Sequence, residues 1–481
     1  MRPRLKKSLL AAFLLLFLSA GAGLFWLGAT ESGLHWAYQQ AGVYIPGETS
    51  IGRLEGRLFG RITATDIAYQ QADIQVGIGR ATVKWRPMEL LTGSIVISHL
   101  HVQSLNVSLP VAQDSEQNQA VELPDIRLPL RVVIEDGQLD NLNITRGEQQ
   151  FVLQQITLNA SSRRNKIDIE SLGVVADDFD LHIDGSLKPV GNYQHKLNIQ
   201  WHARLSDWPG LTGRGQSRGN LDKIKLRQQI SGPLQLDLKA EARDLLAQLR
   251  WRANIDVSDF NLSRLDASWP AISGKLRLQA DGDRHTASLA AELDGVYPQQ
   301  GPFAASVQLQ LAQDKTVQLE QLLLQSPTTD TTVNASGQWR PDGEDIRNGD
   351  IALELDWENL RWPLTGSAWF DSASGHGRID GKLDNYHITL TADRPLPQAP
   401  PSTWYANASG NLEGLNMDTL RITALDGETT LDGRLDWSPR LAWDVSIAGT
   451  NINPAGQWPQ WPGRLKANLT STGQMQDGQL T

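Results

Sequence analysis

The sequence predicts an all-β protein: one long, repetitive sheet curled into an elongated groove, preceded by a single amino-terminal transmembrane helix. Apolar and polar residues alternate over most of the chain, Gly and Trp-Pro recur along it, and helix-like patterns are almost confined to its start. Of 481 residues, 42 are Gly, 16 are Trp and none is Cys. An apolar fraction of 40% excludes wholesale disorder.

The charge balance and the missing cysteines exclude several classes of function. The chain carries 54 acidic and 44 basic residues, and this net charge of −10 argues against a general nucleic-acid-binding protein. Without cysteine there is no disulfide, thiolate metal site, iron–sulfur cluster or cysteine nucleophile. The composition suits a protein exported into an oxidising space.

The first thirty residues predict a membrane anchor. Residues 1–7 carry four basic side chains, and residues 8–30 carry no charge. Residues 9–27 are an apolar run of 19 residues, which as a helix spans about 28 Å, close to the ~30 Å hydrocarbon core. Since basic flanks stay in the cytoplasm, we expect the bulk of the chain in the periplasm of a Gram-negative cell. The anchor residues that we single out are Leu9, Leu14, Leu18, Leu24 and Leu27.

A cleaved signal peptide is the competing interpretation of this segment. The apolar core at 9–18 is followed by the small residues of 19–22, as cleavage requires. The apolar run continues through bulky side chains to Leu27, however, so a retained anchor is favoured. Both interpretations export the body of the chain.

After the anchor, the pattern predicts one short helix and then strands. Residues 32–41 fit an amphipathic helix capped by Ser32, with Leu34, Tyr38 and Ala41 on one side. The period then becomes two, which is typical of strands with one apolar and one polar face. Clear alternation covers residues 54–62, 234–240, 307–311 and 353–356; a short turn is expected at 87–91, an ambiguous helix or strand at 241–249, and loops at 113–120 and 394–401.

A degenerate sequence repeat, marked by Trp-Pro pairs and glycines, recurs along the predicted strands. Trp-Pro occurs at 208–209, 269–270, 362–363, 458–459 and 461–462. Gly185, Gly337 and Gly433 precede three of these pairs by 23, 25 and 25 residues, which indicates a recurring unit. Since Pro cannot donate to a central ladder, we expect these pairs at strand ends and turns, with Trp packed over the corner. The chain stops soon after Gly463, as a repeat cut short at its carboxy-terminal end would.

So many one-sided strands, with so few helices to cover them, must bury their apolar faces against each other. Stacked sandwiches would do this, and so would a sheet curled around its own apolar side, which a repeat favours. A curled sheet encloses a groove whose natural guests are acyl chains; the alternative is a tightly filled structural core. The groove-lining residues that we select are Leu54, Leu58, Ile62, Ile95 and Ile97.

Catalytic and metal-binding patterns are weak. Residues 215–219 match G-x-S-x-G, but no buried strand precedes them and no helix follows, so a Gly-rich repeat turn is the better interpretation. His99 and His101 share one strand face without a third ligand, and a solvated face is favoured. We therefore expect that the protein is not an enzyme and that it binds neither a cofactor nor a metal ion. Two further clusters allow two interpretations each. The acidic residues Asp177, Asp178 and Asp180 could bind a cation, but a polar loop is favoured. The basic residues Arg53, Arg57 and Arg61 fall on one strand face, where they could contact lipid headgroups, but plain solubilising charge is favoured.

The amino-terminal region resembles the TamB family, the inner-membrane subunits of the translocation and assembly module and relatives of AsmA-like proteins. The resemblance covers about the first 110 residues. Its motifs are Tyr44-Ile45-Pro46-Gly47, Ile51-Gly52-Arg53-Leu54-Glu55-Gly56-Arg57-Leu58-Phe59-Gly60, Asp66-Ile67-Ala68-Tyr69, and Val83, Trp85, Pro87, Gly93, Ile95, Ile97 and Leu100.

The resemblance implies a signal-anchor (residues 1–30), a family-signature region (31–110) and a β-taco with an apolar groove (111–481). It also implies phospholipid transport, outer-membrane protein assembly and partnership with TamA, an outer-membrane protein of the Omp85 type. TamB proteins are much longer, and the carboxy-terminal domain that engages TamA has no counterpart here, so that contact is assigned to no residue.

Three functional hypotheses follow. The first is an inner-membrane-anchored periplasmic conduit that carries phospholipid acyl chains along its trough. The second is a scaffold whose strand edges template client strands of outer-membrane proteins or autotransporters. The third and weakest is a secreted repeat adhesin, which requires signal cleavage near Ala22.

Overall fold

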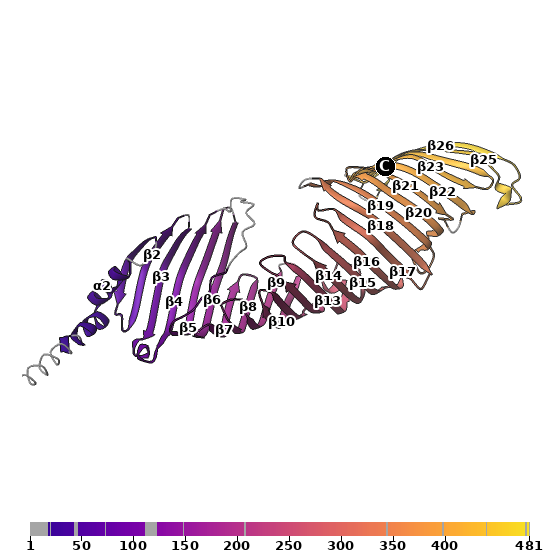
Figure 1. Cartoon of the computed structure of the whole chain (residues 1–481). Coiled ribbons are helices and arrows are strands. Elements are labelled where there is room, and N and C mark those ends of the chain that lie inside the picture. The colour runs from indigo at the N-terminus through magenta and orange to yellow at the C-terminus, as the bar shows by residue number, and fades with distance from the viewer. Residues whose placement is uncertain are drawn as a thin grey trace, which may run out of the picture. The chain divides into compact units, whose positions relative to one another are not determined.

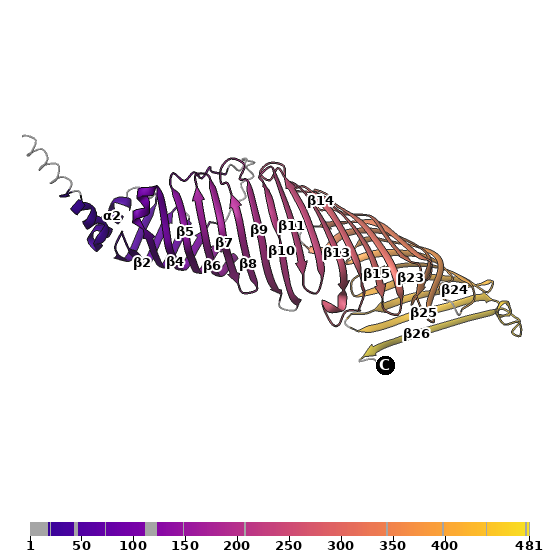
Figure 2. The same cartoon turned by 90° about the horizontal axis from the view of Figure 1, so that it is seen from below.

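The computed structural model describes residues 18–480 except for 20, 43–46, 73, 111–122, 148, 206–207, 343–344, 397–398, 439 and 477–478. The chain divides into two compact units. The first comprises Met1–Gly232 with Ala242–Ala247, and the second comprises Pro233–Glu241 with Gln248–Thr481. Both are built almost entirely of strands, as predicted (Figures 1 and 2).

The first unit is a sheet in which each strand pairs with the next along the chain (Figure 1). The β4–β5 pair is parallel, whereas the other pairs of this unit are antiparallel. Its elements are α2 (Glu31–Gly42), β1 (Glu48–Gly56), β2 (Arg61–Gln71), β3 (Ile74–Arg86), the 3-10 turn η1 (Pro87–Thr92), β4 (Ser94–Leu109), β5 (Arg131–Arg146), β6 (Gln149–Arg163), β7 (Lys166–Ala176), β8 (Phe179–Leu187), β9 (His195–Leu205), β10 (Trp208–Asn220) and β11 (Lys223–Ser231).

The second unit is an antiparallel meander from β13 to β27. The strand β12 (Gln235–Arg243) crosses the division between the units. The other elements are β13 (Arg250–Asn261), η2 (Leu262–Arg264), β14 (Ser273–Gly282), β15 (Ala287–Tyr297), β16 (Gly301–Leu311), β17 (Val317–Ser326), β18 (Thr331–Asp342), β19 (Asp345–Trp362), β20 (Phe370–Lys382), β21 (Asn385–Asp393), β22 (Ser402–Gly410), β23 (Gly414–Ala424), β24 (Gly427–Asp436), β25 (Leu441–Ile452), η3 (Pro454–Gly456), β26 (Leu465–Gln476) and β27 (Gln479–Leu480).

The predicted helix exists, but its cap is Thr30 rather than Ser32. Thr30 Oγ1 accepts a hydrogen bond from the backbone N–H of Gly33 at 3.1 Å, the geometry of an N-cap. Leu34 on this helix is 4% exposed and packs with Leu54 and Ala64 of the first strands. The helix α2 therefore closes the core at the start of the first unit.

The alternation at 54–62 spans a hairpin rather than one strand. β1 ends at Gly56 and β2 begins at Arg61, and between them Arg57 N donates to Arg61 O at 3.1 Å. Arg53, Arg57 and Arg61 therefore do not lie on one strand as expected: Arg53 is on β1, Arg57 is in the turn and Arg61 is on β2, although the register keeps Arg53 and Arg61 on the same face of the hairpin. The turn at 87–91 is confirmed as η1, and residues 244–249 form a turn rather than a helix.

A line of bends crosses the first unit and reverses the alternation of side chains. Asp66, Ser104 and Asn141 have φ near +54°, +58° and +59°, and none of them has a partner in the strand register. Across the bend at Asp66, Ala64 and Ile67 pack in the same core although they are three residues apart. The left-handed residue costs about 1 kcal/mol and keeps the apolar side chains on both sides of the bend on one face.

The Trp-Pro pairs lie at strand ends, as predicted. Those of the second unit occupy the β13–β14, β19–β20 and β25–β26 turns, and because alternate turns of a meander share an edge, they line one edge of the sheet. Their side chains cover the turns only in part: the ring centroids of Trp362 and Tyr297 lie 6.3 Å apart, and those of Trp458 and Trp461 lie 6.2 Å apart. Trp269, Trp362, Trp458 and Trp461 are 43%, 39%, 45% and 64% exposed.

Two His–Asp pairs join the parallel strands β4 and β5. His99 Nδ1 lies 2.7 Å from Asp136 Oδ2, and His101 Nε2 lies 2.7 Å from Asp140 Oδ2. Hydrogen bonds from Gln138, first, and from His101 lower the pKa of Asp140 below its ordinary value. Its carboxylate therefore stabilises the fold above the unfolded pKa, near 3.8, and this contribution is lost as the pH falls through the lower folded pKa.

In Asp140→Asn we expect the free energy of unfolding at pH 7 to fall by about 1 kcal/mol, and the difference from wild type to shrink as the pH drops below about 4. Urea unfolding followed by circular dichroism at pH 7 and pH 3 measures this. Asp136→Asn is the matched control, because Asp136 is 62% exposed and its pair is more screened. A difference that is the same at both pH values would contradict the linkage.

Candidate functional site

The first unit carries an unbroken apolar row across its eleven strands. Each member lies directly opposite the next in the strand register, so all of the side chains are on one face of the sheet. Among them, Leu54 and Ala64 are buried against α2. The members of this first-unit row are Leu54, Ala64, Ala81, Val102, Leu139, Ile156, Val174, Leu181, Trp201, Gly213 and Ile230.

The second unit has an equivalent row across fourteen strands, from β13 to β26. It contains no polar side chain, although it is drawn from fourteen separate segments of the sequence. The members of this second-unit row are Ile255, Leu278, Ala291, Val307, Leu322, Ala335, Leu355, Gly377, Leu390, Ala406, Leu420, Leu431, Ile447 and Leu469.

The opposite face of the second unit is polar and bears ion pairs. Arg277 Nη1 lies 3.7 Å from Glu292 Oε2, and Arg378 Nη1 lies 3.5 Å from Glu354 Oε1. These residues neighbour members of the second-unit row in sequence, so consecutive side chains alternate between the two faces. Such exposed pairs contribute about 0–1 kcal/mol each and mainly keep this face in water.

The apolar rows are only half covered. In the part of the chain that the structure describes, α2 packs on the first strands, residues 21–29 form a further α-helix before it, and the other helical elements are 3-10 turns of three to six residues. Among the described residues, half of the buried hydrophobic side chains are alanines, whereas bulky row members such as Leu278, Leu322 and Leu355 are half-buried. This arrangement leaves aliphatic surface for an apolar ligand, since each buried methylene gains about 0.8 kcal/mol.

The structure brings the five selected groove residues near the apolar face at the start of the first unit. Leu54 is 9% exposed, and Leu58 and Ile62 pack against its cluster. Ile97 lies opposite Trp85 and Ile134 in the register, and Ile95 precedes it by two residues on β4. Their role in lining a groove stays a prediction.

The predicted anchor lies partly outside the described residues. Leu9 and Leu14 are outside them, whereas Leu18, Leu24 and Leu27 are helical. Leu18 and Leu24 are 62% and 60% exposed. Among the described residues, no helix combines the length and the apolar character that a membrane crossing requires.

The G-x-S-x-G segment is neither a nucleophile elbow nor the turn that we expected. It lies within β10 and pairs with β9 on one side and β11 on the other, so Ser217 is part of an extended strand. Ser217 Oγ lies 2.8 Å from His195 Nε2, a pairing that the sequence did not indicate. An elbow requires a sharp turn from a strand into a helix, which is not found here.

Most of the metal candidates are engaged by other side chains through hydrogen bonds or charge pairs. His99 and His101 each face an aspartate across the β4–β5 pair. Asp177 accepts from Gln154, and Asp180 lies 3.8 Å from His202 and 4.0 Å from Arg204. Within the described ranges, no three His, Asp or Glu side chains are grouped as a metal ion would need.

One known family matches the chain over most of its length. The family model described as "TamB, N-terminal domain" matches residues 20–122, 112–342 and 347–481. The match therefore extends from the helical start through both sheet units, well beyond the first 110 residues. No solved structure matches the chain.

Proposed function

The chain belongs to the TamB family, and we propose that it is an inner-membrane-anchored periplasmic conduit in which phospholipid acyl chains lie along the apolar face of its sheets. The unbroken apolar rows support this most directly, because they offer a path without a polar interruption through eleven strands of one unit and fourteen of the other. A lipid tail that slides along such a row exchanges one aliphatic contact for another and meets no desolvation barrier.

The membrane attachment and the partners belong to the same proposal. Residues 8–30 anchor the chain in the inner membrane, with the amino terminus in the cytoplasm. Its partner in the outer membrane is a TamA-like protein of the Omp85 type. The protein thereby bridges the two membranes and supports phospholipid transport to, and protein assembly into, the outer membrane.

Photo-crosslinking distinguishes the conduit from the strand-scaffold alternative. A benzophenone side chain at Leu278, in the second-unit row, is expected to form phospholipid adducts in cells. The same group at Gln279, on the opposite face of the same strand, is the matched control and should form none. The absence of a lipid adduct at Leu278, together with peptide adducts along the outer edge of β1, would contradict the conduit and favour the scaffold.

A further inference from the structure

Three cations lie side by side on the polar face near the end of the first unit. Arg218 on β10 is directly opposite Lys196 on β9 and directly opposite Lys225 on β11. The next residues, Leu197, Ser217 and Leu226, face the apolar side. Like charges in directly opposed positions destabilise a sheet, so this row has an energetic cost.

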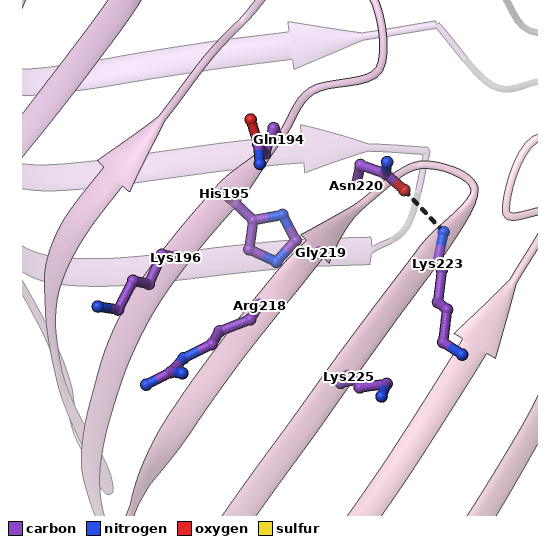
Figure 3. A pocket seen from close by; sticks show the side chains of 8 residues that line it. All are labelled: Gln194, His195, Lys196, Arg218, Gly219, Asn220, Lys223 and Lys225. Carbon is purple, nitrogen blue, oxygen red and sulfur yellow. Dashed lines mark hydrogen bonds between the residues drawn. The ribbon is translucent and has the colours of Figure 1, made fainter.

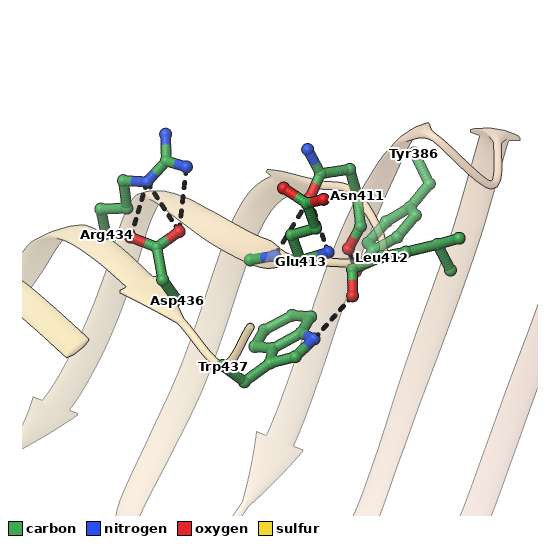
Figure 4. Close-up of polar contacts among 8 residues, drawn as sticks. Tyr386, Asn411, Leu412, Glu413, Arg434, Asp436 and Trp437 are labelled. Atoms are coloured by element: carbon green, nitrogen blue, oxygen red, sulfur yellow. Dashed lines mark hydrogen bonds and ion pairs between the residues drawn. The ribbon is translucent and has the colours of Figure 1, made fainter. Parts of the chain in front are cut away.

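Within the described residues of the first unit, no acidic side chain pairs with these three cations. In the described part of the chain, none of the three cations forms an ion pair, and Arg218 is held by the neutral side chain of Gln216. Asp184, diagonal to Lys196, is engaged by Asn198 Nδ2 at 2.6 Å. By contrast, Arg434 in the second unit lies 2.9 Å from Asp436, which raises the pKa of Arg434 (Figure 4).

The cations line a pocket of about 470 Å³. Its other lining residues include Asn220 and Lys223 from the β10–β11 turn, and none is acidic (Figure 3). Asn220 Oδ1 accepts from the backbone N–H groups of Asp222 and Lys223 at 3.0 and 2.9 Å, which fixes this turn and orients the Asn220 amide. The pocket therefore concentrates positive charge in a chain whose net charge is −10.

We propose that Lys196, Arg218 and Lys225 bind a phosphate group on the polar face of the sheet. The guanidinium of Arg218 presents a planar fork that pairs two phosphate oxygens, while the two flanking ammonium groups each reach another oxygen as flexible point charges. A carboxylate has two oxygens and one charge, so it would leave two of the three cations uncompensated, whereas a phosphate dianion leaves one. The site faces away from the apolar rows and therefore does not depend on the conduit.

Isothermal titration of the full chain in neutral-detergent micelles tests the site with two probes, inorganic phosphate and dihexanoyl phosphatidic acid. In the combined variant Lys196→Gln, Arg218→Gln, Lys225→Gln we expect at least a tenfold loss of affinity. The matched control Arg80→Gln, Arg146→Gln, Arg214→Gln removes three exposed cations of the same unit and should bind as wild type does. Binding of both probes identifies a general phosphate site, whereas binding of the lipid alone identifies a headgroup.

A stability measurement accompanies the titration. Without phosphate and at low salt, the site variant should melt about 1–3 °C above wild type, because repulsion between opposed cations is gone. Wild type, unlike the variant, should gain stability when phosphate replaces chloride at equal ionic strength. Three results overturn the proposal: no binding of either probe by wild type, equal affinities in wild type and the site variant, or an equal loss in the control. Tight binding of a short single-stranded RNA in place of both probes overturns it as well.

Discussion

Two carboxylates placed side by side in the second-unit row should stop lipid from passing that point. In Val307→Glu with Leu322→Glu, the new charges lie directly opposite each other on β16 and β17, and the flanking positions of the row are Ala291 and Ala335, which offer no charge to pair them. A charge in an apolar lining costs several kcal/mol, and a barrier of about 3 kcal/mol slows passage roughly a hundredfold. The rate at which labelled phospholipid reaches the outer membrane in cells should fall at least tenfold.

The matched control uses the neighbouring residues of the same two strands. Gln308 and Gln321 are also directly opposite each other but exposed on the polar face, so Gln308→Glu with Gln321→Glu adds the same charge without touching the row. This control should transport as wild type does. Circular dichroism of both variants checks that the meander is intact. Normal transport by a folded Val307→Glu, Leu322→Glu protein would rule out a conduit along this face.

Lipid that co-purifies with the protein separates a conduit from a reservoir. Residues 31–481 carrying Val307→Glu and Leu322→Glu are exported without the anchor and purified without detergent. They should retain most of the phospholipid that the wild-type segment retains, because only two positions of a long row are blocked. Phospholipid transport by the full chain with the same two substitutions, measured in cells, should nevertheless fail. A proportional loss of both quantities would indicate that the face stores lipid and does not pass it on.

Sequence patterns predicted the strands well because alternation is a local signal. Residues 307–311 and 353–356 alternate cleanly, and they lie in β16 and β19 with one apolar and one polar face. The same signal placed Leu54, Leu58 and Ile62 on one side, yet it missed the hairpin between them. A four-residue turn keeps the alternation in phase, so Leu58 packs with the cluster although it belongs to neither strand.

Register is what the sequence could not supply. Lys196 and Arg218 are far apart in the chain and become neighbours only because β9 and β10 pair with that particular offset. The bend at Asn141 is also invisible to a strict period of two, since a left-handed residue resets which side chains face the core. The apolar rows and the cation pocket are therefore properties of pairing, whereas the alternation is a property of each strand alone.

The second large effect is expected at Trp357, a buried side chain of β19 in the second unit. Its side chain is 4% exposed, and its Nε1 donates to Ser372 Oγ at 2.9 Å. Ser372 is fully buried, and its hydroxyl lies 2.9 Å from the carbonyl oxygens of Ser374 and Asp393. Gly375 lies directly opposite Trp357, where a Cβ would be 2.0 Å from indole Cζ2. Gly375→Ala should therefore cost about 2–3 kcal/mol and lower the melting temperature of this unit by about 5–10 °C.

Two residues along the same strand, Gly377 provides the control, because a Cβ there would meet Leu390 Cδ1 at an ordinary 3.5 Å. Gly377→Ala should be neutral or slightly stabilising, since it also reduces the entropy of the unfolded chain. Adding Trp357→Phe to Gly375→Ala removes the clashing indole atoms and should recover part of the loss, though the carbonyl of Thr391, 2.6 Å from the same Cβ, limits the recovery. Equal melting temperatures for the two alanine variants would mean that β20 moves freely away from β19, and that Trp357 does not fix the spacing of the strands beneath the apolar face.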